Sequence, residues 1–471
     1  MKLTMFAALS ALCASALGAP VIQQGKSCHL PGAEEALRCV TLPVALDYAK
    51  PGPTLRLHVT VAPAFRESAR PDPLFVLAGG PGQAGTDVLV LLNQVFRRTR
   101  AARDIVFIDQ RGTGLSGKLD CEKKLSEEEL SEAEIERETD LCIASVKQPL
   151  AAYNTANAAR DIEQVRLALG YGKVNLWGAS YGTRLAQAYA RAYPDQVRAL
   201  ILDGVAAPDQ VIPAGGRDGQ AALELLFAQC AADKACNKAY PTLRSDFAAL
   251  SAKVAAGPLQ IELSDPRTAR PVKVRMTRDR FLATVHNILY SPQDSRRLPF
   301  LIHSAYNGRW QPFVARRNAA SDFSADGPVS QLMYLAVVCA EDYPRLTPQL
   351  RAADSAPLTA PLLERVDSMC GKVKVPAVAL SVPTPIGAPV LMLSGAMDPV
   401  TPPRRAEAAA KFMARPRHLV VANAGHGISQ LGCVPRLLRE FLDRPERALD
   451  SACLSEIPAP TFQLGSAGPQ P

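Results

Sequence analysis

The sequence predicts an α/β protein in which a mostly parallel sheet is flanked by helices and carries a large, mainly helical inserted cap. Three observations support this prediction. Short apolar strands alternate with helical segments up to residue 205, which is typical of a parallel sheet covered on both faces. Between residues 206 and 388 the pattern becomes mostly helical. From residue 389 the alternation of strands and helices resumes.

The composition is that of a globular protein with a sizeable core. Of the 471 residues, 48% are hydrophobic and 21% are charged. The formal net charge of +8 is spread along the chain, without a basic run or an arginine-rich helix. This distribution argues against a nucleic-acid partner and against binding to a membrane surface.

The first 18 residues have the pattern of a secretory signal peptide. One lysine precedes an apolar run, and small residues at Ala16 and Gly18 favour cleavage after Gly18. The apolar run is too short to span a bilayer, and no later stretch reaches that length. Leu12 precedes Cys13, where a lipid-anchoring signal needs a small residue. We therefore expect an exported, soluble monomer, either periplasmic or extracellular.

Eleven cysteines include Cys13, so an even number follows the expected cleavage site, as suits a disulfide-bonded exported protein. They fall into sequence-adjacent pairs that allow five local disulfides, although the sequence does not fix the connectivity. No C-x-x-C or H-E-x-x-H motif occurs, so we expect no metal site. The neighbouring cysteines are Cys28 and Cys39, Cys121 and Cys142, Cys230 and Cys236, Cys339 and Cys370, and Cys433 and Cys453.

The first part of the predicted core, residues 19–205, begins with a pair of strands and continues as alternating strands and helices. Glycine-rich turns follow two of the strands. The expected strands are 38–48, 54–64, 73–79, 104–110, 173–177 and 197–205, and the expected helical segments are 86–98, 127–138, 154–170 and 181–193.

The predicted cap covers residues 206–388, and the second part of the core covers residues 389–456. Residues 457–471 are rich in proline and glycine and are expected to form a flexible tail. In the cap we expect helices at 219–236, 243–256 and 278–290 and strands at 259–265 and 270–276. In the second core part we expect strands at 389–395 and 417–424 and helices at 404–414 and 434–442.

A candidate nucleophile, Ser180, lies between Gly178 and Gly182 in the order G-x-S-x-G. A short buried strand precedes it, and a helical pattern follows until Pro194. A serine on a tight strand-to-helix turn needs glycines on both sides, because the backbone is strained and neighbouring chains come close. We therefore predict that this turn lifts the Ser180 hydroxyl out at the end of the sheet.

A serine nucleophile needs a base, and His426 is the candidate among six histidines. It lies between two glycines in "NAGHGISQ", after a predicted strand and before a helix. Loops at the carboxyl ends of parallel strands are where catalytic groups belong. The other five histidines suit structural roles; they are His29, His58, His286, His303 and His418.

Two aspartates compete for the role of the acid that orients His426. Asp398 follows the strand 389–395 on a short turn and is the preferred candidate. Asp203 ends the preceding strand and could instead form a hydrogen-bonded turn that leads into the cap.

The oxyanion of an acyl-transfer intermediate needs backbone N–H groups that are already in position. One should come from Tyr181, the residue after the nucleophile. The second should come from the loop "AGGPGQAG", with Gly80 as the candidate, since glycine lets the backbone approach the substrate closely.

A rival class, a dinucleotide-binding oxidoreductase, is suggested by two G-x-G-x-x-G strings at residues 80–85 and 112–117. The first string follows a strand, and Asp109 ends the next strand. Against this class, Pro81 occupies the tight turn where a backbone donor is wanted, and Asp109 continues directly into the second glycine-rich turn. An exported, cysteine-rich protein would also rarely meet nicotinamide cofactors. We therefore expect no cofactor.

The strings "GGPG", "DQRGTGLS", "GASYG", "SGAMDPVTP" and "AGHG", in this order and with an inserted cap, resemble the α/β-hydrolase serine peptidases that include prolyl aminopeptidase and secreted bacterial tripeptidyl aminopeptidases. The resemblance implies an α/β-hydrolase fold and a triad of Ser180, Asp398 and His426. It also implies that residues 389–456 correspond to the C-terminal region of the tripeptidyl enzymes. Ala78 stands where prolyl aminopeptidases usually carry a histidine, which moves the likeness toward the tripeptidyl branch.

The family recognises the free ammonium of a peptide by acids that project from the cap. By this resemblance, Glu341 and Asp342 in "VVCAEDYP" are candidates, and a solvated surface pair is the alternative. The function implied is that of an exported serine aminopeptidase that acts on peptides through an acyl-enzyme and releases short peptides or single residues. A carboxylic-ester hydrolase is the first alternative, and a catalytically idle binding module is the second.

Overall fold

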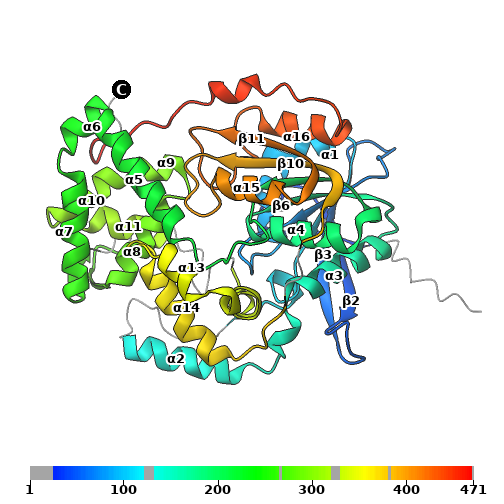
Figure 1. Ribbon diagram of the computed structural model, residues 1–471, viewed down its shortest axis with the longest axis horizontal. Coiled ribbons are helices and arrows are strands. Elements are labelled where there is room, and N and C mark those ends of the chain that lie inside the picture. The colour runs from blue at the N-terminus through cyan, green and yellow to red at the C-terminus, as the bar shows by residue number, and fades with distance from the viewer. Residues whose placement is uncertain (1–24, 121–131, 265–267, 320–328, 380–382, 469–471) are drawn as a thin grey trace, which may run out of the picture.

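A nine-stranded sheet forms the centre of the protein in the computed structural model (Figure 1). The structure describes residues 25–120, 132–264, 268–319, 329–379 and 383–468, so the predicted signal peptide and Cys121 lie outside the described residues. Along the sheet the strands follow the order β1-β2-β3-β5-β4-β6-β7-β10-β11. They are β1 (Lys26–Cys28), β2 (Leu37–Ala45), β3 (Thr54–Ala62), β4 (Leu74–Leu77), β5 (Ile105–Ile108), β6 (Val174–Ala179), β7 (Val197–Asp203), β10 (Ile386–Gly395) and β11 (Met413–Val421).

The strands from β5 to β11 in this order are parallel, whereas β1, β2 and β3 are antiparallel and form one edge. β4 lies between β5 and β6, so the chain reverses direction across the sheet at that point. In open α/β sheets such a switch point creates a crevice at the carboxyl ends of the strands. The predicted fold class, a mostly parallel sheet flanked by helices, is confirmed.

Helices cover both faces of the sheet, because alternate side chains of each strand point to opposite faces. On β4, Phe75 and Leu77 pack with α3 (Thr155–Ala168) and α4 (Tyr181–Ala192). Leu74 and Val76 pack on the other face with α16 (Val434–Asp443). The expected helix at 86–98 is built from a 3₁₀ turn, a π turn and α1; these span Thr86–Leu91, Leu92–Phe96 and Arg97–Arg100.

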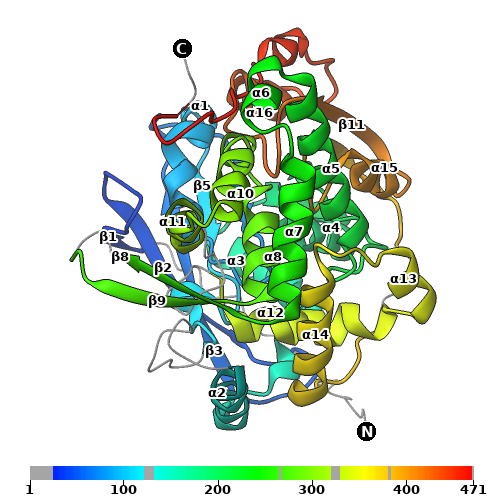
Figure 2. The same ribbon diagram turned by 90° about the vertical axis from the view of Figure 1, so that its left-hand side faces the viewer.

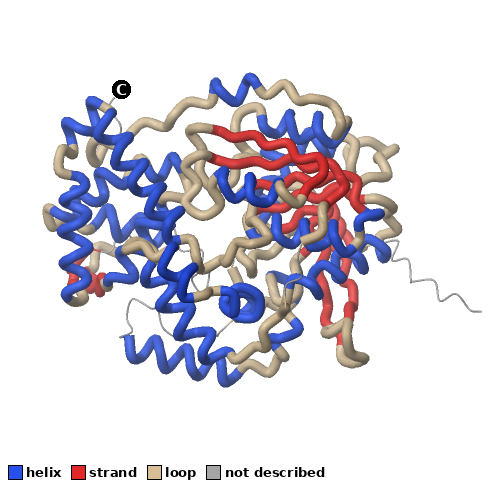
Figure 3. The backbone as a smooth tube through the Cα atoms, viewed as in Figure 1, coloured by secondary structure: helices blue, strands red, loops and turns tan. Residues whose placement is uncertain are grey.

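The inserted segment has its own apolar cluster, centred on Phe281, which stacks on Phe313 with ring centroids 5.2 Å apart. Its helices gather on one side of the sheet and face the viewer in Figure 2. Figure 3 shows that the strands of the large sheet lie away from this helical part, whereas β8 and β9 lie within it. The elements are α5 (Gly216–Ala232), α6 (Lys234–Ala239), α7 (Leu243–Ala256), β8 (Leu259–Ser264), β9 (Pro271–Met276), α8 (Arg278–Ile288), α9 (Pro292–Ser295), α10 (Leu298–Tyr306) and α11 (Gln311–Ala319).

The later helices of the insertion are placed differently. Leu332, Met333 and Leu335 of α12 (Gln331–Val337) pack in the same cluster as α3 and α4 of the core, not in the cluster of Phe281. A π turn at Val338–Asp342 continues α12 and brings this segment beside the start of α4. The remaining helices are α2 (Glu132–Ser145), α13 (Pro348–Ala353), α14 (Ala360–Val373) and α15 (Pro403–Ala410).

The C-terminal segment packs on the insertion, in contrast to the flexible tail expected from its composition. Phe462 is buried within the cluster of Phe281, and the Arg296 guanidinium lies 4.3 Å from the centre of its ring. The Tyr240 hydroxyl donates to the Gln463 carbonyl at 3.0 Å. One large buried aromatic ring is enough to hold a proline-rich segment against the fold.

Four of the five expected disulfides are present, between Cys28 and Cys39, Cys230 and Cys236, Cys339 and Cys370, and Cys433 and Cys453. The fifth involves Cys121, which lies outside the described residues. The described part of the chain contains no helix with the length and apolar character needed to cross a membrane.

The helix expected at 404–414 is shorter in the structure, because α15 ends at Ala410 and β11 already begins at Met413. Met413 and Ala414, which favour helices, therefore belong to a strand. β11 is an edge strand, where Pro416 is tolerated since an edge does not need every backbone donor.

Candidate active site

Ser180 lies on a sharp turn between β6 and α4. Its φ of 53° and ψ of −122° place a non-glycine residue in a region that costs about 1–3 kcal/mol. The turn is held by backbone hydrogen bonds. The Ser180 N–H donates to the Asp203 carbonyl at 2.9 Å, and the Ser180 carbonyl accepts from the Thr183 N–H at 2.9 Å and the Thr183 hydroxyl at 2.6 Å.

The two glycines around Ser180 are required by close contacts of the backbone. A Cβ added to Gly178 would lie 2.4 Å from the Gly182 carbonyl oxygen, and one added to Gly182 would lie 2.1 Å from the Leu77 carbonyl oxygen. Neither contact leaves room for a side chain. Gly178 is therefore required because the start of α4 folds back on it, and Gly182 because the turn packs against the end of β4.

The glycine-rich loop after β4 lies beside Ser180, because β4 and β6 are neighbours. A Cβ built on Gly79 would be 3.2 Å from the Ser180 Cβ. Gly80, the predicted oxyanion donor, has a φ of +101°. The loop is fixed by hydrogen bonds to Ala78 O from the Gln110 side chain and to Gly82 O from the Ser330 N–H, at 3.0 and 2.9 Å.

Tyr181 is the first residue of α4, and the first N–H groups of a helix have no partner within that helix. The Tyr181 side chain is buried, and its hydroxyl lies 2.8 Å from the Thr155 hydroxyl. The oxyanion role of Tyr181 and Gly80 stays a prediction.

Asp109, which could have contacted a ribose in a dinucleotide-binding protein, is occupied inside the fold. Its buried carboxylate accepts from the Thr86 N–H at 2.8 Å, the Thr86 hydroxyl at 3.1 Å and the Leu115 N–H at 2.8 Å. Asp109 therefore ties the two glycine-rich turns to each other. In the described ranges, no group of three or more His, Cys, Asp or Glu side chains is arranged to hold a metal ion.

Asp398 and His426 form a direct pair, with Asp398 Oδ2 2.8 Å from His426 Nδ1. The other carboxylate oxygen accepts from the N–H groups of Val400 and Thr401, both at 2.8 Å. The Thr401 hydroxyl donates to Asp398 Oδ2 at 2.8 Å. These donors fix the orientation of the carboxylate, and the carboxylate fixes the imidazole.

The pair also shifts the protonation of both partners. Burial lowers the pKa of the His426 imidazole, but the charge and hydrogen bond of Asp398 and the charge of Asp203 outweigh burial, so that this pKa is raised above 6.5. Burial raises the pKa of the Asp398 carboxyl, but His426 and the backbone donors outweigh it and lower that pKa below 3.8. Asp398 is thus an anion at neutral pH that stabilises an imidazolium.

The structure brings the Ser180 turn and the His426 loop together at the end of β7. Asp203 O accepts the Ser180 N–H, and a Cβ built on the next residue, Gly204, would be 3.1 Å from His426 Cε1. The Asp203 carboxylate accepts from the N–H groups of Ile428 and Ser429 and has no hydrogen bond to the imidazole. Of the two competing acids, Asp398 is the one that contacts His426.

The inserted segment contacts the His426 loop from the other side. The His426 N–H donates to the Tyr290 carbonyl at 2.8 Å, and the rings of Tyr290 and His426 are in a T-shaped arrangement with centroids 5.1 Å apart. His286 packs edge-on to Tyr290, and burial lowers the pKa of its imidazole to about 4. His286 is therefore neutral at physiological pH.

Glu341 and Asp342 are buried, so the alternative of a solvated surface pair is wrong. Glu341 accepts from the Thr155 N–H and hydroxyl, both at 2.6 Å. Asp342 pairs with Arg184 at 2.8 Å and with Arg345 at 2.7 Å. Their role in binding a peptide ammonium stays a prediction.

Sequence reasoning missed Thr155, Arg184, Tyr290 and Thr401, all of which contact predicted site residues. Thr401 lies three residues after Asp398, so a search for hydroxyl donors next to the acid could have found it. The other three are distant in sequence from their partners, and no local pattern marks them.

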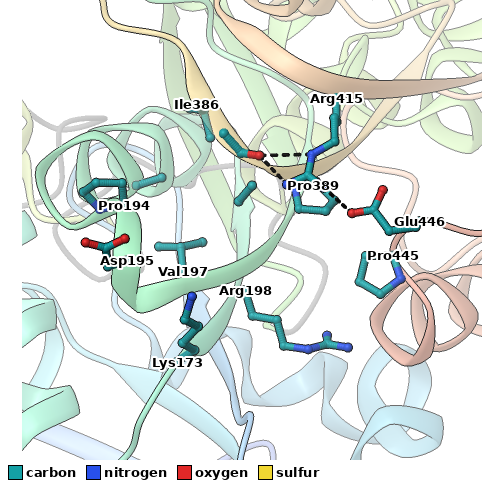
Figure 4. A pocket seen from close by; sticks show the side chains of 13 residues that line it. Lys173, Pro194, Asp195, Val197, Arg198, Ile386, Pro389, Arg415, Pro445 and Glu446 are labelled. Atoms are coloured by element: carbon teal, nitrogen blue, oxygen red, sulfur yellow. Dashed lines mark hydrogen bonds and ion pairs between the residues drawn. The ribbon is translucent and has the colours of Figure 1, made fainter.

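A surface hollow of about 480 Å³ lies elsewhere on the sheet (Figure 4). It is lined by Lys173, Arg198, Pro389 and Arg415, which lie at or next to the amino ends of β6, β7, β10 and β11. Ser180 and His426 follow the carboxyl ends of β6 and β11. The hollow therefore lies at the amino ends of the parallel strands, whereas the candidate active site lies at their carboxyl ends.

The fold and the site define a class, the serine hydrolases and peptidases with an α/β core. The chain belongs to the alpha/beta hydrolase fold family, whose model matches residues 72–430.

Several curated relatives carry the names of peptidases. Serine protease Hip1 of Mycobacterium tuberculosis (strain ATCC 25618 / H37Rv) is 30% identical over 279 residues, which cover 54% of this chain and 53% of that protein. Tripeptidyl aminopeptidase of Streptomyces coelicolor is 32% identical over 194 residues, 37% of this chain and 36% of that protein. Proline iminopeptidase of Neisseria gonorrhoeae is 34% identical over 145 residues, 30% and 36% of the two chains. The chain thus matches about half or less of the length of these relatives. Their names and the family match confirm the resemblance to α/β-hydrolase serine peptidases.

We predict that His426 and His286, which pack against the same ring of Tyr290, titrate on opposite sides of the ordinary histidine midpoint. His426 should have a midpoint above 6.5, and His286 a midpoint of about 4. Because a raised pKa keeps the imidazolium to higher pH, His426 should become neutral only above the ordinary histidine midpoint. NMR titration of the imidazole signals in Ser180→Ala protein measures both values. Asp398→Asn assigns the signal and should lower the His426 midpoint; a His426 midpoint below 6.5 without that substitution would contradict the account.

Proposed function

We propose that the protein is an exported serine aminopeptidase that cleaves short peptides, with a tripeptidyl preference, from free N-termini through an acyl-enzyme. The contact that carries this proposal is the 2.8 Å hydrogen bond between Asp398 and His426, in a loop that adjoins the strained turn of Ser180. The peptidase names of the curated relatives support the substrate class. The pattern of the first 18 residues and the disulfides support export.

In the proposed mechanism the Ser180 hydroxyl attacks the carbonyl carbon of the scissile peptide bond. His426 accepts the hydroxyl proton through Nε2, while Asp398 holds Nδ1 and stabilises the imidazolium. The oxyanion of the tetrahedral intermediate accepts hydrogen bonds from the N–H groups of Gly80 and Tyr181. His426 then gives its proton to the leaving amine, and the C-terminal part of the substrate departs. The N-terminal part remains as an ester on Ser180. Water, activated by the neutral His426, hydrolyses the ester on Ser180 and restores the hydroxyl.

We propose that the cap, residues 206–388, sets the step length and that the core parts, residues 19–205 and 389–456, carry the chemistry. The position of Tyr290 supports this division, since its carbonyl accepts the N–H of His426 from the cap side. A cap that contacts the catalytic loop can couple the seating of a peptide to the geometry of the base.

We propose that Glu341 contributes the negative charge that attracts the peptide ammonium. Glu341 accepts from the N–H and the hydroxyl of Thr155, which are neutral groups, whereas Asp342 is matched by two arginines. Burial raises the pKa of the Glu341 carboxyl, and hydrogen bonds from Thr155 oppose that rise. Thr155 also contacts the Tyr181 hydroxyl, so a structural role of Glu341 at the turn of Ser180 is the alternative that a substitution must exclude.

Ser180→Ala should abolish peptide cleavage. We expect kcat/KM on a chromogenic tripeptide with a free amine to fall by about 10⁶-fold, because the nucleophile is lost. Both proteins would be assayed with aminoacyl, prolyl and tripeptidyl substrates, each with a free and with a blocked amine, and with a short-chain ester. Serine-dependent turnover of the ester alone would make the protein an esterase. No serine-dependent turnover of any substrate would favour the idle binding module.

Glu341→Gln should separate recognition of the ammonium from the chemistry. Removing one charged partner costs about 1.5–3 kcal/mol, so we expect kcat/KM to fall by roughly 10–100-fold on free-amine tripeptides. Turnover of the short-chain ester should change less than about twofold, as should both activities in the control Glu364→Gln, an exposed carboxylate of α14. Equal losses on peptide and ester would mean that Glu341 acts only through Thr155 and Tyr181, against the proposal.

A further inference from the structure

Asp203 connects the two halves of the candidate active site through its backbone. It is the last residue of β7, and β7 lies between β6 and β10 in the sheet. In the register of these strands, Asp203 stands opposite Ala179 and opposite Leu393. Its carbonyl accepts the Ser180 N–H at 2.9 Å, and the next N–H, of Gly204, donates to Leu393 O at 3.0 Å. The nucleophile turn is thus pinned to the end of β7.

The side chain of the same residue holds the His426 loop. Its two oxygens accept from the Ile428 N–H at 2.9 and 3.0 Å, and Oδ2 also accepts from the Ser429 N–H at 2.8 Å. The Ser429 side chain adds a hydrogen bond to this carboxyl and itself accepts from the Trp177 indole N–H at 2.9 Å. Each of these partners offers a donor, and a set of donors suits the carboxylate form of Asp203.

We propose that Asp203 is a positioning residue that sets the His426 loop relative to Ser180 and keeps a second negative charge next to the imidazole. This inference rests on the proposed function, because it assigns to Asp203 a task in the reaction of Ser180 and His426. Asp203 does not replace Asp398, which alone of the two has a hydrogen bond to the imidazole.

The charged and titratable groups around His426 come from both the core and the cap. Asp398 follows β10, Asp203 ends β7, and His286 and Tyr290 come from the cap at α8 and just after it. His286 is neutral near pH 7, because burial lowers its pKa to about 4. Burial raises the pKa of the Asp203 carboxyl above 3.8, and hydrogen bonds from Ser429 and Ile428 and the charge of His426 offset only part of that rise. In the carboxylate form, Asp203 favours the imidazolium of His426.

Two functions of Asp203 follow, and they have different signatures. Loss of a loop contact misplaces the base, which lowers kcat with little change in KM, since a shift of about 1 Å in a reacting group costs about 100-fold. Loss of the negative charge lowers the pKa of His426. In the plot of kcat/KM against pH, the acidic limb, where activity rises as His426 loses its proton, then moves to lower pH. A residue that only stabilises the fold would not move that limb.

Asp203→Asn is the test, because it keeps the shape of the side chain, removes the charge and turns one acceptor into a donor. We expect kcat on a free-amine tripeptide to fall by about 100-fold, KM to change less than threefold, and the acidic limb to move to lower pH. Asp246→Asn is the matched control, since Asp246 is a buried aspartate of α7 with a 2.8 Å contact to His303. It should leave kcat and the limb as they are.

An acidic limb that does not move in Asp203→Asn, or a kcat equal to that of the unsubstituted protein, would overturn the proposal. If Asp203→Asn does not fold, Ser429→Ala supplies the test. It removes the hydroxyl contact and keeps the charge, so kcat should fall about tenfold with the limb in place, and an unchanged kcat would overturn the proposal.

NMR titration of His426 separates this inference from the proposed function. If the unsubstituted protein cleaves no substrate in a Ser180-dependent way, the proposed function fails. The His426 midpoint in Asp203→Asn still decides the charge effect: a lower midpoint than in the unsubstituted protein supports it, and an equal midpoint overturns it.

Discussion

The backbone of Ser180 turns from β6 into α4 with a positive φ, and the rest of the site is arranged around that turn. The turn is possible only because Gly178 lets the start of α4 come close and Gly182 lets the chain pass within contact distance of the end of β4. The same closeness brings the glycine-rich loop after β4 to the Ser180 side chain. The strain is offset by the backbone hydrogen bonds to Asp203 and Thr183 and by the packing of α4 on the sheet.

His426 lies near this turn because the carboxyl ends of parallel strands lie on the same side of the sheet. β6 ends before Ser180, β7 before Gly204, and the loop after β11 carries His426. Two aspartates divide the work on this loop. Asp398 orients the imidazole, and Asp203 accepts from the backbone that follows it. The cap adds a third contact through the carbonyl of Tyr290, so the histidine is held from the core and from the insertion.

The sequence could predict those parts of the fold and site that depend on local patterns. Alternating strands and helices predicted the parallel sheet, and glycines beside Ser180 and His426 marked turns that leave no room for side chains or need special backbone angles. Contacts between distant residues that lie in no recognisable motif were not predictable. The contact of Glu341 with Thr155 is an example. The C-terminal segment was expected to be flexible from its prolines, yet Phe462 finds a buried place on a cap that lies far away in the sequence. The sequence marked Glu341 and Asp342 as candidates for binding a peptide ammonium, but it could not reveal Arg184, the partner of Asp342.

The central claim is that Ser180 is the activated nucleophile of a peptidase, and covalent trapping tests it most directly. The folded protein would be treated with a fluorophosphonate, with and without a free-amine tripeptide substrate, and the modified residue located by peptide mass spectrometry. The account predicts one adduct, on Ser180, that forms more slowly when the tripeptide is present and is strongly reduced in His426→Ala protein. An adduct on another serine, or none on Ser180 in the folded protein, would contradict the account.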